Sequence, residues 1–241
     1  MSTLEKVSEY PGSDFELIFG TQGTCSDKLA ILYNRDRLEL VEPSQELISE
    51  VGGDRAPLVA QFRSIPDGAE LFAVVNHFAR SNTGSRNRQA TNLRSWIEQQ
   101  SLPVVTLGDF NMEYSVDLDL DRPRSCDGYL ELGNEAFTIF TASDEIRWIQ
   151  PQCLANGTCP IEGTGCFLPC FNSILDFIFV GGTAAADWTG TSEIAFSNDT
   201  NYCANDPLGG ADHRPVLATL NYSGGLAVQP PPTEPDPSRP Y

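Results

Sequence analysis

Short apolar segments with strand-like patterns dominate this chain, and they constrain its fold more than any other feature. Only residues 86–100 have helical periodicity, with Ala90, Leu93 and Ile97 on one face. The segments typical of strands are residues 15–19, 28–35, 37–41, 58–63, 70–76, 103–107, 174–180, 193–196 and 215–222. Many strands with few helices predict an α/β fold of stacked sheets with helices on the outside.

The same pattern indicates where the folded part ends. A length of 241 residues permits one large core or two small ones. The last strand pattern stops at Tyr222, and the chain after it carries two adjacent glycines and then six prolines. We therefore expect one domain over residues 1–222 and a Pro-rich tail or linker over residues 223–241.

The acidic composition limits the ways in which the chain can meet nucleic acid. Its formal net charge is −18 at pH 7. Binding along a phosphate backbone depends on Lys and Arg, so the charge argues against a protein that coats nucleic acid. An enzyme that meets phosphate through a bound divalent cation and a few local arginines is compatible with it. We expect nucleic acid as a substrate, without a stable complex.

Cysteine usage favours an oxidising compartment, because seven cysteines are many for a cytosolic enzyme of this size. Four of them lie in one Gly- and Pro-rich loop: Cys153, Cys159, Cys166 and Cys170. Their spacing lacks the C-x2-C pairs of a zinc ribbon, so disulfides are favoured over a metal, with the pairing left open. No apolar run is long enough to span a bilayer. We expect an extracellular or periplasmic protein whose export signal precedes residue 1.

Polar residues follow or interrupt four of the apolar segments. The sequences concerned are VVNHF at residues 74–78, VVTLGDFN at 104–111, LDF at 175–177 and ADHRPV at 211–216. Taken singly, His77 at a strand end is more simply a capped histidine, and Gly108-Asp109 is more simply a turn. Asp176 differs, because a carboxylate inside an apolar strand costs several kcal/mol unless it is paired. The two histidines of the chain, His77 and His213, are the natural partners.

Together these residues supply what phosphodiester hydrolysis requires. A divalent ion neutralises the phosphate, a base activates water, and donors stabilise the developing charge. Carboxylates and carboxamide oxygens are the hard ligands that Mg²⁺ prefers. An imidazole oriented by a buried carboxylate is a competent general base near neutral pH.

The order and spacing of these motifs resemble the endonuclease/exonuclease/phosphatase superfamily, most closely its pancreatic-deoxyribonuclease-like branch, over residues 15–222. The resemblance implies a four-layer α/β/β/α sandwich of two mainly antiparallel sheets. It implies that His213 is the general base, that Asp176 orients it, and that Asp212 is a metal ligand. Mg²⁺ is the expected cofactor, with Mn²⁺ or Ca²⁺ as alternatives.

The resemblance also assigns residues to the phosphate. Asp109 and Asn111 would contact the metal, the nucleophile and the phosphate, and His77 would donate to a phosphate oxygen. Asn76, Arg80 and Arg88 are candidate substrate-binding residues, with Arg86 as a further arginine of the same segment. A solvated loop and helix face explains these arginines equally well. Asp27 lies near the place where the branch carries an acidic partner for His77.

One part of the family pattern has no counterpart in the sequence. Family members begin with a strand that carries an Asn, then a helix, then a strand that ends in a metal-binding glutamate. Residues 1–12 already resemble the helix after that glutamate, and neither Glu5 nor Glu9 follows an apolar strand. We therefore expect a chain that lacks the first strands of the fold and that has weak activity or none.

Three functions fit these sequence features. The first is a secreted metal-dependent endonuclease or exonuclease, favoured by the cysteine-rich loop and by the arginines after His77. The second is an inositol-phosphate phosphatase or a sphingomyelinase-type phosphoesterase; the latter would present exposed aromatic residues, for which Trp148 and Trp188 are candidates. The third is a non-catalytic domain of the same fold, which the absent glutamate favours and the intact histidines and carboxylates disfavour.

Overall fold

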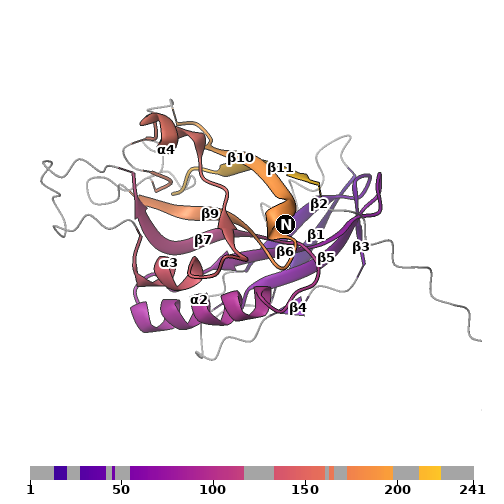
Figure 1. The fold of residues 1–241 in the computed structure, drawn as a ribbon, viewed down its shortest axis with the longest axis horizontal. Helices are drawn as coiled ribbons and strands as arrows, with labels where there is room; N and C mark the ends of the chain where they lie inside the picture. Colours follow the sequence, from indigo (N-terminus) through magenta and orange to yellow (C-terminus); the bar gives the residue numbers. More distant parts are fainter. Residues whose placement is uncertain are drawn as a thin grey trace, which may run out of the picture.

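A seven-stranded sheet forms the centre of the molecule (Figure 1). The computed structural model describes residues 14–20, 28–41, 45–46, 55–116, 133–160, 163–165, 173–197 and 212–223. The strands of this sheet run in the order β3-β5-β6-β7-β9-β8, with β4 also paired to β5. Their bounds are β3 Leu38–Leu40, β4 Gln45–Glu46, β5 Leu58–Ser64, β6 Glu70–His77, β7 Val104–Ser115, β8 Arg147–Trp148 and β9 Ser173–Gly181.

Two small antiparallel sheets cover one face of the central sheet, and two helices cover the other (Figure 1). The small sheets pair β1 (Phe15–Phe19) with β2 (Ala30–Asn34) and β10 (Trp188–Ile194) with β11 (Val216–Tyr222). The helices are α2 (Thr83–Ile97) and α3 (Glu135–Phe140), while the short α4 (Gln152–Asn156) contacts β10. A 3-10 turn, Ala185–Asp187, precedes β10. The predicted α/β sandwich of two mainly antiparallel sheet layers is confirmed.

Apolar side chains on alternate sides of the central strands form a hydrophobic core on each face of the sheet. In β5, Leu58, Ala60 and Phe62 pack against the β1–β2 sheet, while Val59 packs toward the helices. Successive side chains of a strand point to opposite faces, so one apolar strand serves both layers. The helix-side core is strongly aromatic, with Phe110 at its centre in edge or tilted contact with four other phenylalanine rings.

The one predicted helix is present, but it begins earlier than its apolar period indicated. Asn82 caps α2, because its side chain accepts a hydrogen bond from the backbone N–H of Ser85 at 2.9 Å. Ala90, Leu93 and Ile97 form the buried face, as predicted. The helix ends at Ile97 rather than at residue 100.

Strand positions agree with the sequence pattern better than strand partners do. The segments predicted at residues 28–35 and 37–41 form β2 and β3, which flank a tight turn but belong to different sheets. The hairpin of β5 and β6 is present. The strand expected at 193–196 starts at Trp188 and ends at Ile194. The predictions for residues 1–12, for the acidic loop that follows residue 116 and for the Pro-rich tail lie outside the described residues.

The end of the strand predicted at residues 103–107 was wrong, because β7 continues to Ser115. Phe110 and Met112 are fully buried, so the alternation of apolar residues continues past the Gly-Asp dipeptide. The pairing with β9 breaks between Asp109 and Tyr114, where β7 bulges, and it then resumes. The GDFN motif is therefore part of a bulged strand and not a turn.

The topology brings the polar motifs to one region. β6 and β7 are parallel, joined by the α2 crossover, and His77 lies beside Asp109 in their register. β9 is antiparallel to β7 and places Asp176 opposite Asp109. The segment before β11 brings His213 to the same region, through a bridge to Gly165.

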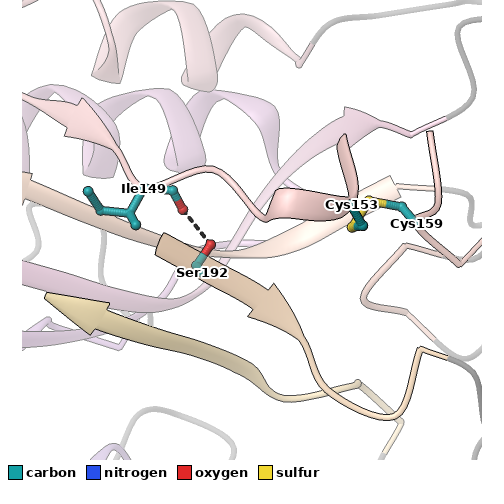
Figure 2. The surroundings of a disulfide bond; sticks show 4 residues. All are labelled: Ile149, Cys153, Cys159 and Ser192. Atoms are coloured by element: carbon teal, nitrogen blue, oxygen red, sulfur yellow. Dashed lines mark hydrogen bonds between the residues drawn. A yellow bond between two sulfur atoms is a disulfide. The ribbon is translucent and has the colours of Figure 1, made fainter. Parts of the chain in front are cut away.

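A disulfide bond joins Cys153 to Cys159, with Cα atoms 4.6 Å apart, at the segment that contains α4 (Figure 2). The Ser192 hydroxyl of β10 donates to the carbonyl of Ile149 at 2.7 Å and anchors the start of this segment. The other five cysteines lie outside the described residues. In the described part of the chain, no helix has the length and apolar character needed to cross a membrane.

Candidate functional site

A pocket of about 200 Å³ opens where β6, β7 and β9 meet the segment before β11. Its lining residues are His77, Arg80, Asp109, Asn111, Gly165, Leu175, Asp212 and His213. Six of these eight residues were singled out from the sequence motifs. Within the part of the chain that the structure describes, the acidic residues that line the pocket are aspartates.

His213 and Asp176 form a close pair at this pocket. The Nδ1 atom of His213 lies 2.7 Å from an Oδ atom of Asp176. Burial disfavours the imidazolium, but the hydrogen bond and charge of Asp176, helped by Asp109 and Asp212, raise the pKa of His213 to about 9. The partner predicted for the carboxylate inside the apolar strand is therefore His213.

Asp109 faces this pair from the neighbouring strand. Burial and the nearby Asp176 carboxylate raise the pKa of Asp109 to about 6. One Oδ atom lies 3.3 Å from Nε2 of His77, and the other accepts the backbone N–H of Asn111 at 2.9 Å. The ligand atoms of Asp109, Asp176 and His213 all lie within 4.8 Å of one another, a grouping that could hold a metal ion.

The bulge of β7 determines how Asn111 is presented. Asn111 has a φ of 50°, in the left-handed region that asparagine tolerates better than most residues. Its side-chain amide donates to the carbonyl of Phe78 at 3.0 Å, and its carbonyl accepts from the Asn134 amide at 2.9 Å. These bonds fix the bulge to the loop after β6 and to the start of α3.

Gly108 allows β6 and β7 to approach closely just before the site. Its φ is 131°, and a Cβ atom placed there would lie 2.1 Å from the carbonyl oxygen of Asn76. The glycine of the GDFN motif is therefore required by contact with the neighbouring strand as well as by its backbone angle.

Three other candidates lie away from the pocket lining. Asn76 is buried and donates to the Thr106 hydroxyl at 2.5 Å. Arg88 is exposed on α2. Arg86, considered above as a phosphate contact, is buried, and its guanidinium donates to the carbonyls of Ala79 and Arg80 at 3.0 and 2.7 Å. Arg86 therefore supports the loop that carries Arg80. Asp27 lies outside the described residues.

Sequence reasoning missed two residues near the site. Arg55 contributes positive charge that lowers the pKa of Asp109, although burial and Asp176 outweigh it. Thr164 is fully buried and contacts the strand that carries Asp176. Neither residue lies in a motif; their roles follow from the tertiary arrangement. The flanking glycines of Thr164, in the sequence EGTGC, were the available signal of a close backbone approach.

Comparisons with known proteins give similarity at the level of structure. No protein-family model and no curated protein sequence matches the chain. A mannosyl-6-phosphatase of Bacteroides thetaiotaomicron superposes with a TM-score of 0.61 at 17% identity, over 91% of this chain and 81% of that one. An endonuclease/exonuclease/phosphatase family protein of the same organism gives 0.61 and 17%, over 90% and 78%.

A third similar structure is D. rerio TDP2 complexed with single strand DNA product. Its TM-score is 0.63 at 14% identity, over 92% of this chain and 82% of that one. At identities this low, the superpositions establish the architecture alone. That architecture agrees with the family resemblance of the NHF, GDFN, LDF and DHRPV motifs. The chain thus has the fold of the endonuclease/exonuclease/phosphatase family.

Proposed function

We propose that this protein is a divalent-metal-dependent phosphoester hydrolase that cleaves phosphodiesters. The observation that carries the proposal is the 2.7 Å contact between His213 and Asp176, at a pocket that Asp109 and His77 also line. Metal-assisted phosphoester hydrolysis uses a general base with an orienting carboxylate, further carboxylates for the metal, and donors that bind the phosphate. The similar structures include a phosphatase and a protein in complex with a DNA product.

The donor set fits a hard divalent cation. We assign Asp109, Asp212 and Asn111 as the residues that would hold it, since they line the same pocket and offer oxygen ligands. Asp176 and His213 are assigned to proton transfer and not to the metal, because they already bond to each other. Burial and the neighbouring Asp176 carboxylate raise the pKa of Asp109, and a bound cation would favour its charged form. When bound, Mg²⁺ or Mn²⁺ would neutralise phosphate charge and polarise the ester.

His213 acts as the general base in this proposal. Asp176 would hold the proton on Nδ1, so that the neutral ring carries its basic lone pair on Nε2. That atom would take the proton of the attacking water. A raised pKa requires that His213 lose its proton before it can act, so activity should increase with pH on the acidic side of the optimum.

His77 and Arg80 supply positive or hydrogen-bonding groups for the phosphate. Both line the pocket, and Arg80 is held by the buried Arg86 through its carbonyl. Asn76 and Arg88 remain candidates for substrate contacts beyond the pocket. Residues 1–222 would form the catalytic domain, with the Pro-rich segment after it as a tail or linker.

Within this class we favour a secreted nuclease. One similar structure is a complex with a DNA product, which supports a nuclease. The disulfide supports an extracellular or periplasmic site of action. The second candidate is a phosphomonoesterase. It is favoured by the similar mannosyl-6-phosphatase and by the net charge of −18, which disfavours a long polyanion.

The decisive measurement is nicking of supercoiled plasmid by the purified chain with Mg²⁺ or Mn²⁺, compared with EDTA. Removing a general base is expected to lower the rate about 10²- to 10⁴-fold, so His213→Ala should abolish detectable nicking. Arg37→Ala, at an exposed position in the turn between β2 and β3, is the control for loss of a surface charge and should keep its activity. Metal-dependent nicking that survives His213→Ala would overturn the base assignment. Hydrolysis of phosphomonoesters without nicking would replace the nuclease with the phosphatase.

A further inference from the structure

We propose that Thr164 is a positioning residue that aligns Asp176 with His213. This inference rests on the proposed function of that pair, and it adds a residue that no motif contains. Thr164 lies in the segment of residues 163–165, called the strap below, which runs between the start of β9 and the backbone around His213.

Thr164 is bonded to both sides of the pair. Its hydroxyl oxygen accepts the backbone N–H of Leu175 at 2.8 Å and that of Asp176 at 3.3 Å. Its carbonyl accepts the backbone N–H of Arg214, next to His213, at 2.7 Å. The residue has no exposed surface. One buried side chain and its own carbonyl therefore connect the backbone of the carboxylate to the backbone of the base.

The bulge in β7 explains why β9 needs this hydroxyl. Asp176 pairs with Asp109 and Ile174 pairs with Tyr114, so Leu175 is skipped in the register between the two strands. A strand N–H that loses its ladder partner requires another acceptor when it is buried. The Thr164 hydroxyl provides that acceptor at the position next to Asp176.

The glycines of the strap allow it to reach this position. Gly163 has a φ of 63°, and a Cβ atom there would lie 2.2 Å from the carbonyl oxygen of Ser173. Gly165 forms an antiparallel bridge with His213 and also lines the pocket. The strap is thus pressed against β9 on one side of Thr164 and paired with the base on the other.

A purely structural Thr164 and a positioning Thr164 predict different kinetics. If the residue only adds stability, its loss lowers the amount of folded enzyme and leaves turnover per folded molecule unchanged. If it aligns the pair, loss of the hydroxyl shifts Asp176 relative to His213. Proton transfer then becomes slower, while substrate binding, which depends on other pocket residues, changes little.

The test compares Thr164→Val, which removes the acceptor and keeps the shape, with Thr164→Ser, which keeps the acceptor. Thr164→Ala is a second hydroxyl-free variant in case the valine does not fold. Ser192→Ala is the matched control, since Ser192 is also buried and gives a single hydroxyl hydrogen bond, to Ile149 (Figure 2). Rates are measured on bis(4-nitrophenyl) phosphate with Mn²⁺, normalised to folded protein by circular dichroism.

We expect kcat to fall about 10- to 100-fold in the hydroxyl-free variants, with KM within about twofold of wild type. Thr164→Ser should restore most of kcat, and Ser192→Ala should keep it. Equal kcat per folded molecule in Thr164→Val and wild type would overturn the proposal. So would an equal loss of kcat in Thr164→Ser and Thr164→Val.

A spectroscopic measurement separates this proposal from the proposed function. The Nδ1 proton of His213, bonded to Asp176, is expected as a downfield proton resonance that His213→Ala removes. Its loss in Thr164→Val and return in Thr164→Ser support the positioning role, even if no phosphoester is hydrolysed by the wild type. Its persistence unchanged in Thr164→Val overturns that role. Absence of hydrolysis in the wild type, with the resonance intact, counts against the proposed function alone.

Discussion

The charges at the site depend on one another at the scale of single residues. Asp176 raises the pKa of both Asp109 and His213, since it repels the first as a carboxylate and stabilises the second as an imidazolium. Asp109 and His213 thus hold their protons more tightly than isolated groups would. A divalent cation would release those protons, so metal affinity should increase with pH.

Protonation of His213 predicts a pH dependence of stability in the metal-free protein. The folded-state pKa of about 9 lies above the ordinary 6.5, so the stabilisation is complete below pH 6.5 and is lost as pH rises through 9. The free energy of unfolding should fall by on the order of 3 kcal/mol across that window. Urea denaturation in EDTA at several pH values measures it. His213→Gln should remove most of the slope; an unchanged slope in that variant would contradict the attribution.

At the scale of secondary-structure elements, β7 contributes more to the site than any other strand. It pairs in parallel with β6, so His77 lies beside Asp109, and it pairs with β9, so Asp176 lies opposite Asp109. The bulge after Asp109 then turns Asn111 into the same pocket. Successive residues of a strand point to opposite faces, so Phe110 enters the helix-side core while Asp109 and Asn111 line the pocket.

The close approach of β6 and β7 predicts a large effect of one methyl group. Gly108→Ala should lower the free energy of unfolding by at least about 3 kcal/mol, because its Cβ would meet the Asn76 carbonyl and its φ is positive. Gly68→Ala is the control, since Gly68 has a φ of 73° with no atom within 4 Å of an added Cβ. That variant should lose about 1 kcal/mol. Equal losses by chemical denaturation would show that the strand contact is unimportant.

The strands themselves could be predicted from the sequence, but most of their pairing could not. Apolar runs located β1, β5, β6, β9 and β11 to within a residue or two. The parting of β2 and β3 into different sheets depends on which distant strand each one packs against, which periodicity does not encode. The extension of β7 could have been read from Phe110, Met112 and Tyr114, whose alternation continues beyond the Gly-Asp dipeptide.

The sequence indicated which side chains lie together where a buried charge required a partner, but not where the tertiary arrangement decides the direction of a side chain. A carboxylate in an apolar strand had to be paired, and the structure pairs it with His213. Arg86 was a candidate phosphate contact by its position after His77, yet its side chain turns inward to carbonyl groups of the loop. Thr164 carries no charge and lies in no motif, so its hydrogen bonds to β9 follow from the tertiary arrangement.

At the scale of the whole molecule, the net charge of −18 opposes the approach of a polyanion. If the substrate is DNA, kcat/KM should rise several-fold as ionic strength increases from about 20 to 150 mM at fixed metal concentration, because salt screens long-range repulsion. Hydrolysis of bis(4-nitrophenyl) phosphate, a small monoanion, should change by less than about twofold over that range. Initial velocities measured on both substrates at each ionic strength test the predicted salt dependence. A steep fall for DNA with added salt would contradict repulsion and indicate a basic binding surface.

The parallel pairing of β6 with β7 also affects how the protein acquires its structure. Those strands can meet only after α2 has closed the crossover between them, and the pocket further needs β9 and the segment at residues 212–213. Contacts between residues so far apart in the chain form slowly, because the entropy of loop closure opposes them until late in folding. During refolding from denaturant, secondary structure should therefore return well before enzymatic competence. The rate at which activity recovers would then report the rate of the last folding step.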